Sequence, residues 1–595
     1  MPRIAVVNKE KCNPAECGNY LCQRVCPVNK RGEECIVSEQ GKAKIFEEMC
    51  IGCGICPKKC PFGAIDIINL PEDLTKPPVH RYGKNGFHLY GLPIPIFGKV
   101  VGIIGRNGIG KSTAINILSG ILKPNLGKES ENGKQEEAEI SDLITYFKGT
   151  EGQSYFEKLR DGKIKVSYKM QQVDQIPKLF KGTVQDFLLK VTKDLEKIKK
   201  ISEELDFEKV LSSNIDIISG GELQRVVIAA TVLKDANVYF FDEPTSFLDI
   251  KQRMKVAKFI QNLSKKKTEN GEDIAVIVIE HDLIILDYMT DLIHPVYGKE
   301  NVYGIVALSR SSKAGINEFL QGFLRQENIR FRDHAIKFET KVVNKNMDKE
   351  EIISWKNISK VLGNFNLSAE EGAIVKKDVI CVLGENGIGK TTFVKILAGE
   401  IDCEGEIKGK IKVSYKPQYI ETGSDDLVIV YLQDALSKHK NTIIKPLDLE
   451  PLLNQKLSQL SGGQLQRVAI AHVLSQDADL YLLDEPSAYL DVEQRLLVSK
   501  VLRDFISLKG KTAIVVDHDL LFLDYISEKA IVFKGIPSEK GLSQGPFELE
   551  KGMSIFLKDI NMTYRRDDEN NRPRANKEGS QMDQKQKKEK KYYYI

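Results

Sequence analysis

The 595-residue sequence predicts an α/β fold with two P-loop nucleotide-binding domains, preceded by a small, cysteine-rich α+β domain. Three observations support this prediction. A glycine-rich phosphate-loop motif occurs twice, each time between a short apolar run and a helical pattern. The same series of further motifs follows each loop in the same order. Nine of the eleven cysteines fall between Cys12 and Cys60.

Composition narrows the class of protein. There are 87 Lys and Arg against 83 Asp and Glu, so the net charge of +4 does not mark a general nucleic-acid binder, and no DNA partner is expected. The sequence contains no run of about 18 uninterrupted apolar residues, and its N-terminus does not resemble a signal peptide. We therefore expect a cytoplasmic protein with several hydrophobic cores and no membrane contact.

Residues 1–72 carry two cysteine series. The downstream series has the spacing C-x2-C-x2-C-x3-C-P, in which thiolates hold a 4Fe–4S cube; it comprises Cys50, Cys53, Cys56 and Cys60. The upstream series has wider gaps and also ends in a cysteine–proline pair; it comprises Cys12, Cys17, Cys22 and Cys26. Four thiolates also suit structural zinc. The paired cysteine–proline ends and the short spacing favour iron–sulfur.

In two-cluster ferredoxins the fourth cysteine of each series ligates the other cluster. We therefore assign one 4Fe–4S cluster to Cys12, Cys17, Cys22 and Cys60. We assign the second to Cys26, Cys50, Cys53 and Cys56. Cys35 is left over and is not expected to be a ligand. Because so short a segment has little apolar core, the clusters could serve as structural staples, and electron transfer does not follow from them.

Each phosphate loop follows a predicted buried strand, at 100–104 and at 379–383. In such a loop the backbone N–H groups cradle phosphates, the lysine reaches the β and γ phosphates, and the hydroxyl coordinates magnesium. The first loop predicts ATP contacts from Gly105, Asn107, Gly108, Gly110, Lys111, Ser112 and Thr113. The second predicts them from Gly384, Asn386, Gly387, Gly389, Lys390, Thr391 and Thr392.

A second predicted strand in each copy ends in an aspartate suited to hold magnesium, Asp242 and Asp484. The glutamate that follows, Glu243 or Glu485, is placed to orient or deprotonate the attacking water. A Ser-Gly-Gly motif lies 23 residues before the aspartate in both copies, which supports a duplication.

The first copy is 37 residues longer than the second between its phosphate-loop lysine and its aspartate. Most of the excess lies in about residues 127–163, where apolar residues at helical spacing predict a helix-loop-helix after a polar lead. From the pattern alone, packing on its own domain and docking of a partner explain this insert equally well.

The motif series resembles the ABC ATPase superfamily. Together with the cysteine-rich head, the insert and the segments 315–320 and 576–581, it resembles the subfamily E ribosome-recycling factors (the RNase L inhibitor family) over nearly the whole chain, with an archaeal source expected. The resemblance implies a ferredoxin-like two-cluster domain and two ABC-type domains in head-to-tail arrangement. It implies domains at 1–72, 73–309 and 346–550, with hinges at 310–345 and 551–595.

By this resemblance, each nucleotide lies between the phosphate loop of one cassette and the Ser-Gly-Gly signature of the other. One site would combine Lys111, Ser112, Gln171, Asp242, Glu243 and His281 with Ser461 and Gly463. The other would combine Lys390, Thr391, Gln418, Asp484, Glu485 and His518 with Ser219 and Gly221. Magnesium would contact Ser112, Gln171 and Asp242, or Thr391, Gln418 and Asp484. The two glutamates and two histidines would be catalytic, each histidine contacting the γ-phosphate.

Several assignments stay open in the sequence. Tyr82 and Phe87 are candidate adenine-stacking residues, as is Phe365 in the second copy, with core packing an equal alternative for each. Gln172 follows Gln171 directly, so either could serve the first site. Arginines in 310–341 and 565–574 are expected, by resemblance, to contact ribosomal RNA phosphates. The lysine-rich residues 585–591 predict a disordered tail.

The resemblance implies an ATP hydrolase with magnesium and two 4Fe–4S clusters. It would split ribosomes after termination or stalling, together with a release factor or its Pelota-type paralogue. It would then stay for a time on the small subunit, on rRNA and ribosomal proteins. Two alternatives stay open: an ATP-gated electron-transfer protein, and a transporter-type ATPase with separate membrane subunits.

Overall fold

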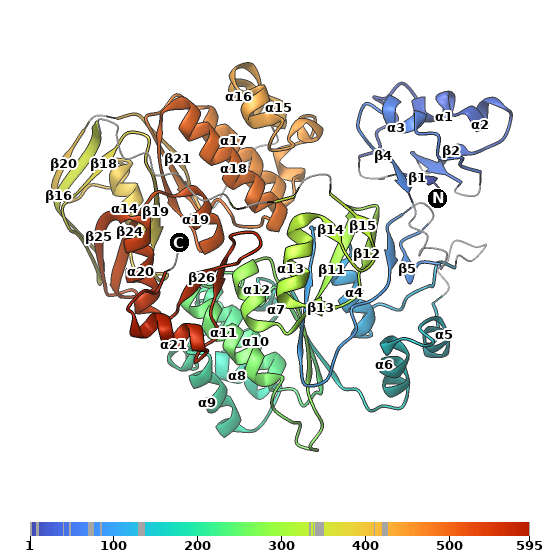
Figure 1. The fold of residues 1–595 in the computed structure, drawn as a ribbon, viewed down its shortest axis with the longest axis horizontal. Helices are drawn as coiled ribbons and strands as arrows, with labels where there is room; N and C mark the ends of the chain where they lie inside the picture. The colour runs from blue at the N-terminus through green and yellow to red at the C-terminus, as the bar shows by residue number, and fades with distance from the viewer. Residues whose placement is uncertain are drawn as a thin grey trace.

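The computed structural model describes residues 3–7, 11–39, 41–46, 49–69, 77–83, 86–128, 137–332, 335–336, 338, 350–409, 411–418 and 426–593. A small N-terminal domain lies beside two larger α/β domains, and the C-terminal segment returns to the boundary between them (Figure 1). The predicted boundaries at 72/73 and 345/346, and residues 129–136 of the insert's polar lead, lie outside the described residues.

The N-terminal domain is α+β, as predicted. It has two antiparallel two-stranded sheets, one of β1 with β4 and one of β2 with β3. Its strands are β1 (Arg3–Val7), β2 (Ile36–Glu39), β3 (Lys42–Ile45) and β4 (Ile65–Asn69). Its helices are α1 (Leu21–Val25), α2 (Pro27–Lys30) and α3 (Ile55–Lys59). Most of its buried core consists of cysteines and small aliphatic residues, so bound clusters would supply much of its interior.

The first cassette is built on a sheet of order β5-β6-β12-β11-β7-β10-β9-β8, with β13 pairing to β11. Its strands are β5 (His80–Arg81), β6 (His88–Tyr90), β7 (Val100–Ile104), β8 (Val166–Lys169), β9 (Val238–Asp242), β10 (Ala275–Ile279), β11 (Leu292–Lys299), β12 (Tyr303–Val306) and β13 (Arg310–Ser311). The central strands β7, β10 and β9 are parallel and fully buried, which explains their continuous apolar runs.

Helices cover both faces of this sheet. They are α4 (Lys111–Leu118), α5 (Ile140–Tyr146), α6 (Glu151–Arg160), α7 (Ile176–Leu179), α8 (Val184–Leu189), α9 (Leu195–Glu204), α10 (Gly220–Val232), α11 (Ile250–Leu263) and α12 (Leu283–Met289), with a 3-10 turn at Glu208–Val210. The pair α5 and α6 confirms the predicted helix-loop-helix. Phe147 and Phe156 of this pair are buried in the first cassette's own core, and the Tyr155 hydroxyl donates to the Leu118 carbonyl at 2.7 Å.

The second cassette repeats the architecture in the order β18-β16-β17-β25-β24-β19-β23-β22-β21, with β20 pairing to β16. Its strands are β16 (Glu351–Leu362), β17 (Phe365–Ala369), β18 (Gly372–Val375), β19 (Val379–Leu383), β20 (Glu404–Lys408), β21 (Val413–Lys416), β22 (Leu480–Asp484), β23 (Thr512–Val516), β24 (Lys529–Ile536) and β25 (Lys540–Glu548). The four predicted buried strands thus all form, as β7, β9, β19 and β22.

The helices of the second cassette are α14 (Lys390–Leu397), α15 (Val428–Tyr431), α16 (Gln433–Lys438), α17 (Gly462–Ser475), α18 (Val492–Lys509), α19 (Leu520–Ile526) and α20 (Leu549–Asp559), with short turns at Lys440–Ile444, Glu450–Leu452 and Leu457–Gln459. Helix α20 continues across residue 550, where the sequence placed the end of this cassette. It does so because Met553, Phe556 and Leu557 are buried and Gly552 lies against Ala530 of β24.

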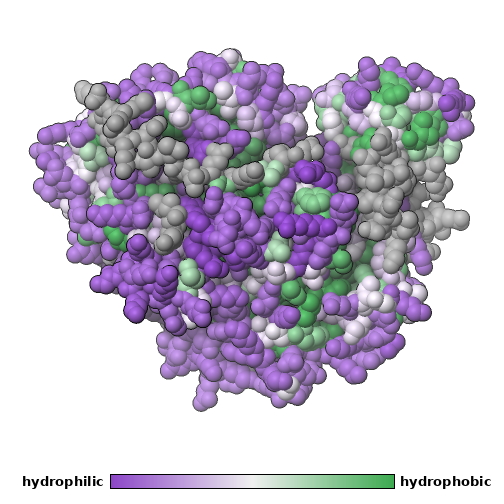
Figure 2. Space-filling view, in the orientation of Figure 1, coloured by the Kyte–Doolittle hydropathy of each residue, from purple (hydrophilic) through white to green (hydrophobic). Residues whose placement is uncertain are grey.

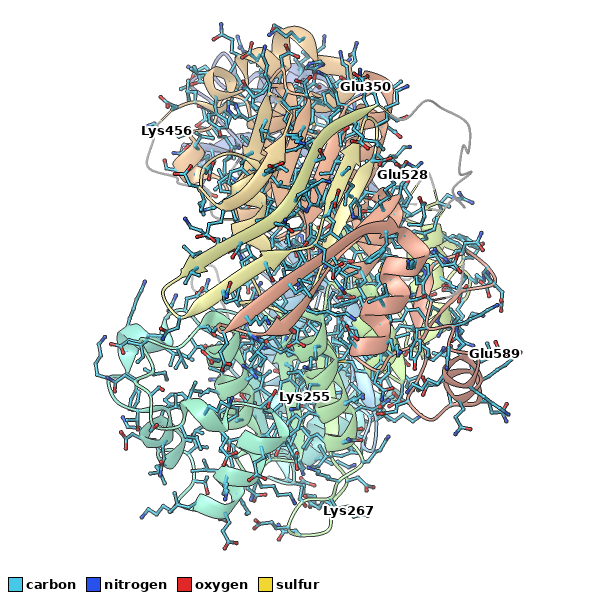
Figure 3. All side chains as sticks on the ribbon, turned by 90° about the vertical axis from the view of Figure 1, so that its left-hand side faces the viewer. Lys255, Lys267, Glu350, Lys456, Glu528 and Glu589 are labelled. Atoms are coloured by element: carbon cyan, nitrogen blue, oxygen red, sulfur yellow. The ribbon has the colours of Figure 1, made fainter. Side chains whose placement is uncertain are left out.

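The two hinge segments lie at the cassette boundary. The first contains α13 (Ser312–Gln321) and the hairpin of β14 (Phe323–Leu324) with β15 (Ile329–Arg330). The second contains the hairpin of β26 (Tyr564–Arg566) with β27 (Pro573–Ala575), and helix α21 (Gln581–Lys588). In the view of Figure 3 the second cassette stands above the first, and Glu589, just after α21, lies at the outer side of the molecule.

The predicted disordered tail is wrong. Residues 581–588 form helix α21. The side chain of Ser580 caps its N-terminus by accepting a hydrogen bond from the backbone N–H of Asp583. Tyr593 is buried and its hydroxyl bonds to the Asp524 carboxylate of α19, while Arg566 donates to the same hydroxyl at 2.8 Å. The lysine content suggested solvation, whereas the segment contains a capped helix and ends on a buried aromatic ring.

Polar residues dominate the surface seen in Figure 2, with apolar residues visible on the N-terminal domain and on part of the first cassette. Within the described part of the chain, no helix is both long and apolar enough to cross a bilayer.

Candidate functional site

The two phosphate loops have the geometry that the motif requires. Helices α4 and α14 begin at Lys111 and Lys390, and the preceding Gly110 and Gly389 have φ of +90° and +94°. A Cβ at Gly110 would lie 2.6 Å from the Phe87 ring. At Gly389 it would lie 2.9 Å from the ring of Phe365. Glycine is therefore needed here for both backbone conformation and space. The two phenylalanines lie against the loops, in the positions of packing residues.

The loop lysines are buried, and their hydrogen bonds go to the loop itself. The ammonium of Lys111 donates to the carbonyls of Gly105 at 2.9 Å and Arg106 at 2.6 Å. That of Lys390 donates to Gly384 at 2.6 Å and to the next carbonyl at 3.0 Å. Burial lowers the pKa of Lys111, and it lowers the pKa of Lys390 to about 8. A phosphate would supply the negative charge that offsets this burial.

The hydroxyl that follows each lysine contacts the carboxylate at the end of the second strand. Ser112 donates to Asp242 at 2.9 Å, and Thr391 donates to Asp484 at 2.7 Å. Burial raises the pKa of both carboxyl groups. A hydroxyl beside a buried carboxylate fits a hard divalent cation, which would favour the ionised carboxylate.

In the first cassette the side chains of Gln171 and His281 converge on Glu243, which has a φ of +47°. Gln171 donates to its carboxylate at 2.7 Å, and the Nε2 of His281 lies 3.4 Å from the same oxygen. Gln172 instead accepts from Gln175 at 2.7 Å. The geometry therefore brings Gln171, rather than its neighbour, to the site.

The second cassette repeats this arrangement around Glu485, which has a φ of +46°. Gln418 donates to the carboxylate at 2.7 Å, and the Nε2 of His518 lies 3.6 Å away. The electrostatics differ between the copies. Burial raises the pKa of Glu243, but His281 and Lys111 outweigh it and hold this pKa at about 2. The pKa of Glu485 is raised by burial and by the nearby Asp517 carboxylate.

Each phosphate loop contacts the opposite cassette. The N–H of Asn107 donates to Asp491 at 3.0 Å, and the N–H of Asn386 donates to Asp249 at 3.0 Å. These aspartates cap α18 and α11, the helices that follow β22 and β9. Ion pairs flank both contacts. Lys251 lies 2.8 Å from Glu385, and Arg106 pairs with Glu493. Both phosphate loops therefore lie at one interface between the cassettes, in the predicted head-to-tail arrangement.

The signature motifs begin helices α10 and α17. Ser219 and Ser461 are exposed, and each caps its own helix by accepting from the backbone of Glu222 or Gln464. Gly221 and Gly463 lie in the first turn of these helices, against the carbonyls of residues 247 and 489. Burial lowers the pKa of Arg467 in α17, and the carboxylates of Asp448 and, next, Glu300 oppose this shift.

Tyr82 is the most available of the three candidate adenine-stacking residues. Its side chain is 44% exposed, and its hydroxyl lies 3.5 Å from that of Thr113 in the first turn of α4. Its ring is 6.5 Å from that of Phe87. Thr392 occupies the matching position in α14.

The fold of the N-terminal domain brings its cysteines together. A pocket is lined by one full set, Cys12, Cys17, Cys22 and Cys60. Burial raises the pKa of the Cys22 thiol to about 11, with Cys12, Cys17 and Cys60 adding to the effect. The described residues contain no group of three His, Cys, Asp or Glu close enough to bind one metal ion. The thiols surround a space instead, which fits a cluster.

The second set gathers beside the first. Burial raises the pKa of Cys56 to about 12, and the neighbours Cys50 and Cys53 add to this shift. Cys35 is buried, and its pKa is raised by burial and then by Cys26 and Cys50. The thiol that the sequence left unassigned thus lies next to two assigned ones. Iron would convert such thiols to thiolates, which burial otherwise disfavours.

Sequence reasoning missed four further residues at these sites. Asp249 and Asp491 lie six residues after Glu243 and Glu485, and Lys169 and Lys416 lie two residues before Gln171 and Gln418. Their recurrence at equal spacing in both copies was the signal that could have found them.

Comparison with known proteins agrees with this geometry. The family model "ABC transporter" matches residues 97–246 and 362–488. The models "Possible Fer4-like domain in RNase L inhibitor, RLI" and "4Fe-4S binding domain" match residues 2–34 and 43–66. Translation initiation factor RLI1 of Saccharomyces cerevisiae is 43% identical, over 100% of this chain and 98% of the relative. This chain belongs to the ABCE1/RLI1 family.

Further ABCE1/RLI1 relatives match over the whole length. An uncharacterized ABC transporter ATP-binding protein of Methanocaldococcus jannaschii is 50% identical, covering 100% of this chain and 98% of its own. A solved structure, "Model of ribosome-bound archaeal Pelota and ABCE1", matches with a TM-score of 0.92 at 48% identity, over 100% of this chain and 99% of that one. As a family member with two ABC ATPase domains and an N-terminal iron–sulfur domain, the chain is an ATP hydrolase.

Proposed function

We propose that the protein is an ATP-driven ribosome recycling factor. It splits ribosomes into subunits after termination or stalling, together with a release factor or a Pelota-type factor, and stays for a time on the small subunit. The main support is the full-length similarity to archaeal ABCE1 in a ribosome-bound structure with Pelota. A second similar structure, at 47% identity and a TM-score of 0.81 over 87% of this chain, pairs an archaeal ABCE1 with the ribosomal stalk protein aP1. Such a factor acts in the cytoplasm.

Hydrolysis follows from the groups at each site. Lys111 and Lys390 bind the β and γ phosphates. When bound, Mg²⁺ would be held by the hydroxyl–carboxylate pairs of Ser112 with Asp242 and Thr391 with Asp484, and would neutralise phosphate charge. The glutamate of each site orients or deprotonates the attacking water. The histidine beside that glutamate, 3.4 Å away in the first site and 3.6 Å in the second, contacts the γ-phosphate. The remaining acceleration comes from positioning and electrostatics.

The interface couples hydrolysis to movement. Because the signature of the opposite cassette completes each site, ATP has more contacts when the cassettes are closed and therefore favours that state. Loss of the γ-phosphate removes this preference. In the structure the contacts of Asp249 and Asp491 with the opposite loops already hold the cassettes together.

Two 4Fe–4S clusters are expected in the N-terminal domain. One is held by Cys12, Cys17, Cys22 and Cys60, and the other by Cys26, Cys50, Cys53 and Cys56. Their role is structural, because the cysteines themselves form much of the domain's small core. The domain is then a rigid element that cassette closure can move against a ribosome-bound factor.

The hinges have a more limited role in RNA contact than the sequence suggested. Arg332 is buried and pairs with Glu493 at 2.6 Å, and Arg572 is buried and pairs with Asp287 at 3.0 Å. These arginines hold the cassettes to each other. Arg325 and Arg330 are exposed. They are the hinge arginines that we assign to contact with ribosomal phosphates.

Sedimentation of intact ribosomes with the protein, a Pelota-type factor and ATP tests the proposal. Free subunits should appear with ATP and not without it. The pair Glu243→Gln and Glu485→Gln should bind ATP, hydrolyse it about 10²–10⁴-fold more slowly and sediment with small subunits. Protein that stays unbound with ATP present would contradict the proposal. Repeating the assay with oxidised and with reduced clusters separates it from ATP-gated electron transfer, which alone predicts a large difference.

A further inference from the structure

Each cassette buries a lysine that phosphate binding does not use. Lys169 ends β8 with 1% of its surface exposed, and Lys416 ends β21 with 0% exposed. Fully buried lysines are rare because removing the charge from water is costly. Burial lowers the pKa of both ammonium groups to about 8, which reports that cost. The same costly burial occurs at matching positions in both cassettes, so we expect the two ammonium groups to have a shared structural role.

The hydrogen bonds of both lysines go to main-chain carbonyls at the catalytic turn. Lys169 donates to the carbonyl of Asp242 at 2.8 Å and to that of Glu243 at 3.1 Å. Lys416 donates to the carbonyl of Asp484 at 2.9 Å and to that of Pro417 at 3.0 Å. In both copies the ammonium therefore binds the peptide that joins the aspartate to the glutamate.

This peptide needs outside support. Glu243 and Glu485 have left-handed φ values of +47° and +46°, which cost about 1–3 kcal/mol for a residue with a side chain. The turn ends the strand, so its carbonyls need hydrogen-bond donors from elsewhere if they are buried. A lysine supplies a charged donor, which forms stronger hydrogen bonds than a neutral one.

A second donor reaches the same turn from the signature helix. Gln224 of α10 donates to the Glu243 carbonyl at 2.8 Å, and Gln466 of α17 donates to the Glu485 carbonyl at 2.6 Å. Both glutamines are buried, with 0% and 1% of their surface exposed. Each lies five residues after the signature serine of its helix.

We infer that Lys169 and Lys416, together with Gln224 and Gln466, are positioning residues that fix the backbone of the catalytic glutamate. The inference rests on the proposed role of Glu243 and Glu485. It also gives a physical link between the two ATP sites. The signature helix that serves one site holds, through its glutamine, the glutamate of the other site.

The full-length protein carrying Lys169→Met and Lys416→Met tests this inference. Methionine fills the space but donates no hydrogen bond. Since a misplacement of about 1 Å can cost about 10²-fold in rate, kcat should fall by about that factor while the KM for ATP stays unchanged. Lys165→Met with Lys412→Met is the matched control, because these exposed lysines lie four residues earlier in the two copies. The control should keep the wild-type kcat.

A second comparison separates positioning from general damage. Added to the pair Glu243→Gln and Glu485→Gln, the lysine substitutions should lower kcat no further, because they act through the glutamates. A further loss there, or a rise in KM equal to the fall in kcat, would overturn the inference. The inference would also be overturned if Lys169→Met with Lys416→Met kept the wild-type kcat while Glu243→Gln with Glu485→Gln was inactive. A fully active glutamate variant would instead overturn the proposed role of the glutamates.

Lys169→Gln with Lys416→Gln covers the case in which the methionine variant does not fold. Glutamine keeps a neutral donor, so kcat should fall less than with methionine, again at unchanged KM. An unchanged kcat in this variant, with the glutamate pair inactive, would also overturn the inference.

Discussion

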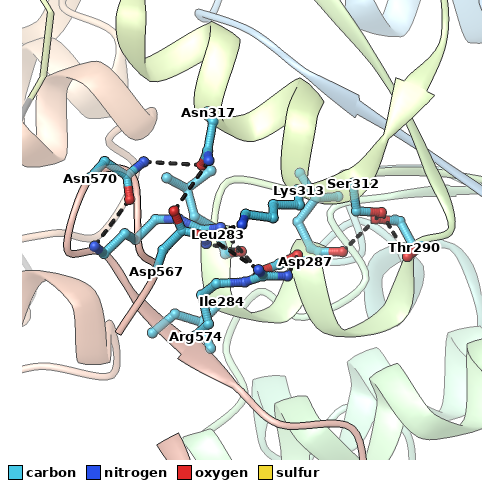
Figure 4. Close-up of polar contacts among 12 residues, drawn as sticks. Leu283, Ile284, Asp287, Thr290, Ser312, Lys313, Asn317, Asp567, Asn570 and Arg574 are labelled. Atoms are coloured by element: carbon cyan, nitrogen blue, oxygen red, sulfur yellow. Dashed lines mark hydrogen bonds and ion pairs between the residues drawn. The ribbon is translucent and has the colours of Figure 1, made fainter. Parts of the chain in front are cut away.

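Asp287 of α12 carries the contact that ties the C-terminal segment to the first cassette. Its carboxylate accepts from Arg572 at 3.0 Å and from Arg574 at 2.6 and 3.0 Å. Figure 4 shows Arg574 between Asp287 and Asp567, with Asn317 of α13 bonded to the same C-terminal segment. Asp287→Asn keeps the shape of the side chain but removes its charge and one acceptor.

The expected cost follows from burial. Arg572 is 0% exposed and Asp287 is 7% exposed, so the substitution leaves a buried guanidinium without its counter-charge. Breaking a buried ion pair in this way costs about 3–5 kcal/mol. For a unit of cassette size, each kcal/mol shifts Tm by about 2–4 °C, which gives a decrease of about 6–20 °C in the first unfolding transition.

Differential scanning calorimetry of wild type, Asp287→Asn and Asp235→Asn measures this effect. Asp235 pairs with Lys165 at 3.2 Å and is 53% exposed, so its substitution should change stability by about 0.5 kcal/mol or less. Limited proteolysis should also cut the C-terminal segment faster in Asp287→Asn. Equal Tm values for the two variants would refute the reasoning that this buried pair fastens the hinge.

Two further predictions concern the head and the interface. Cys22→Ser should remove the absorbance of one cluster and Cys53→Ser that of the other, with ATP binding retained in both variants. Loss of ATP binding together with the cluster would show that the N-terminal domain and the cassettes are not independent. Burial raises the pKa of Asp282 to about 6, and the nearby Asp519 carboxylate adds to this shift. Arg253 and Arg495 lower the same pKa but do not cancel the rise. The folded state therefore binds the proton more tightly than the unfolded state. Stability should fall as pH rises from about 4 to about 6. Asp282→Asn should flatten that part of a Tm-against-pH curve, and an unchanged slope would contradict the assignment.

The sequence predicted the architecture well because the strongest patterns are repeated. The runs that became β7 and β19 are apolar throughout, as buried parallel strands require, and a phosphate loop directly follows each. The helix-loop-helix was also found from spacing. Its packing was not, because periodicity shows that a face is apolar without showing what covers it. Phe147 and Phe156 cover the first cassette's own core.

Other features depend on contacts between residues far apart in the chain. The choice between Gln171 and Gln172 needed the distance to Glu243. The order of the C-terminal tail depends on Tyr593 meeting Asp524, which no local pattern reveals. The hydrogen bond from the Lys169 ammonium to the Asp242 carbonyl joins residues 73 positions apart in the chain. The hinge arginines suggested RNA contact, whereas Arg332 and Arg572 pair with carboxylates of this chain.

Combined substitutions test most directly whether each ATP site is shared between the cassettes, as we propose. Lys111→Ala should disable the site that Ser461 completes. Adding Ser461→Arg should therefore leave the remaining ATPase rate as it is in Lys111→Ala alone. Adding Ser219→Arg should abolish that remainder, because it disables the second site. The opposite pattern, with Ser219→Arg silent and Ser461→Arg abolishing activity, would show that each cassette hydrolyses ATP with its own signature and would contradict shared sites.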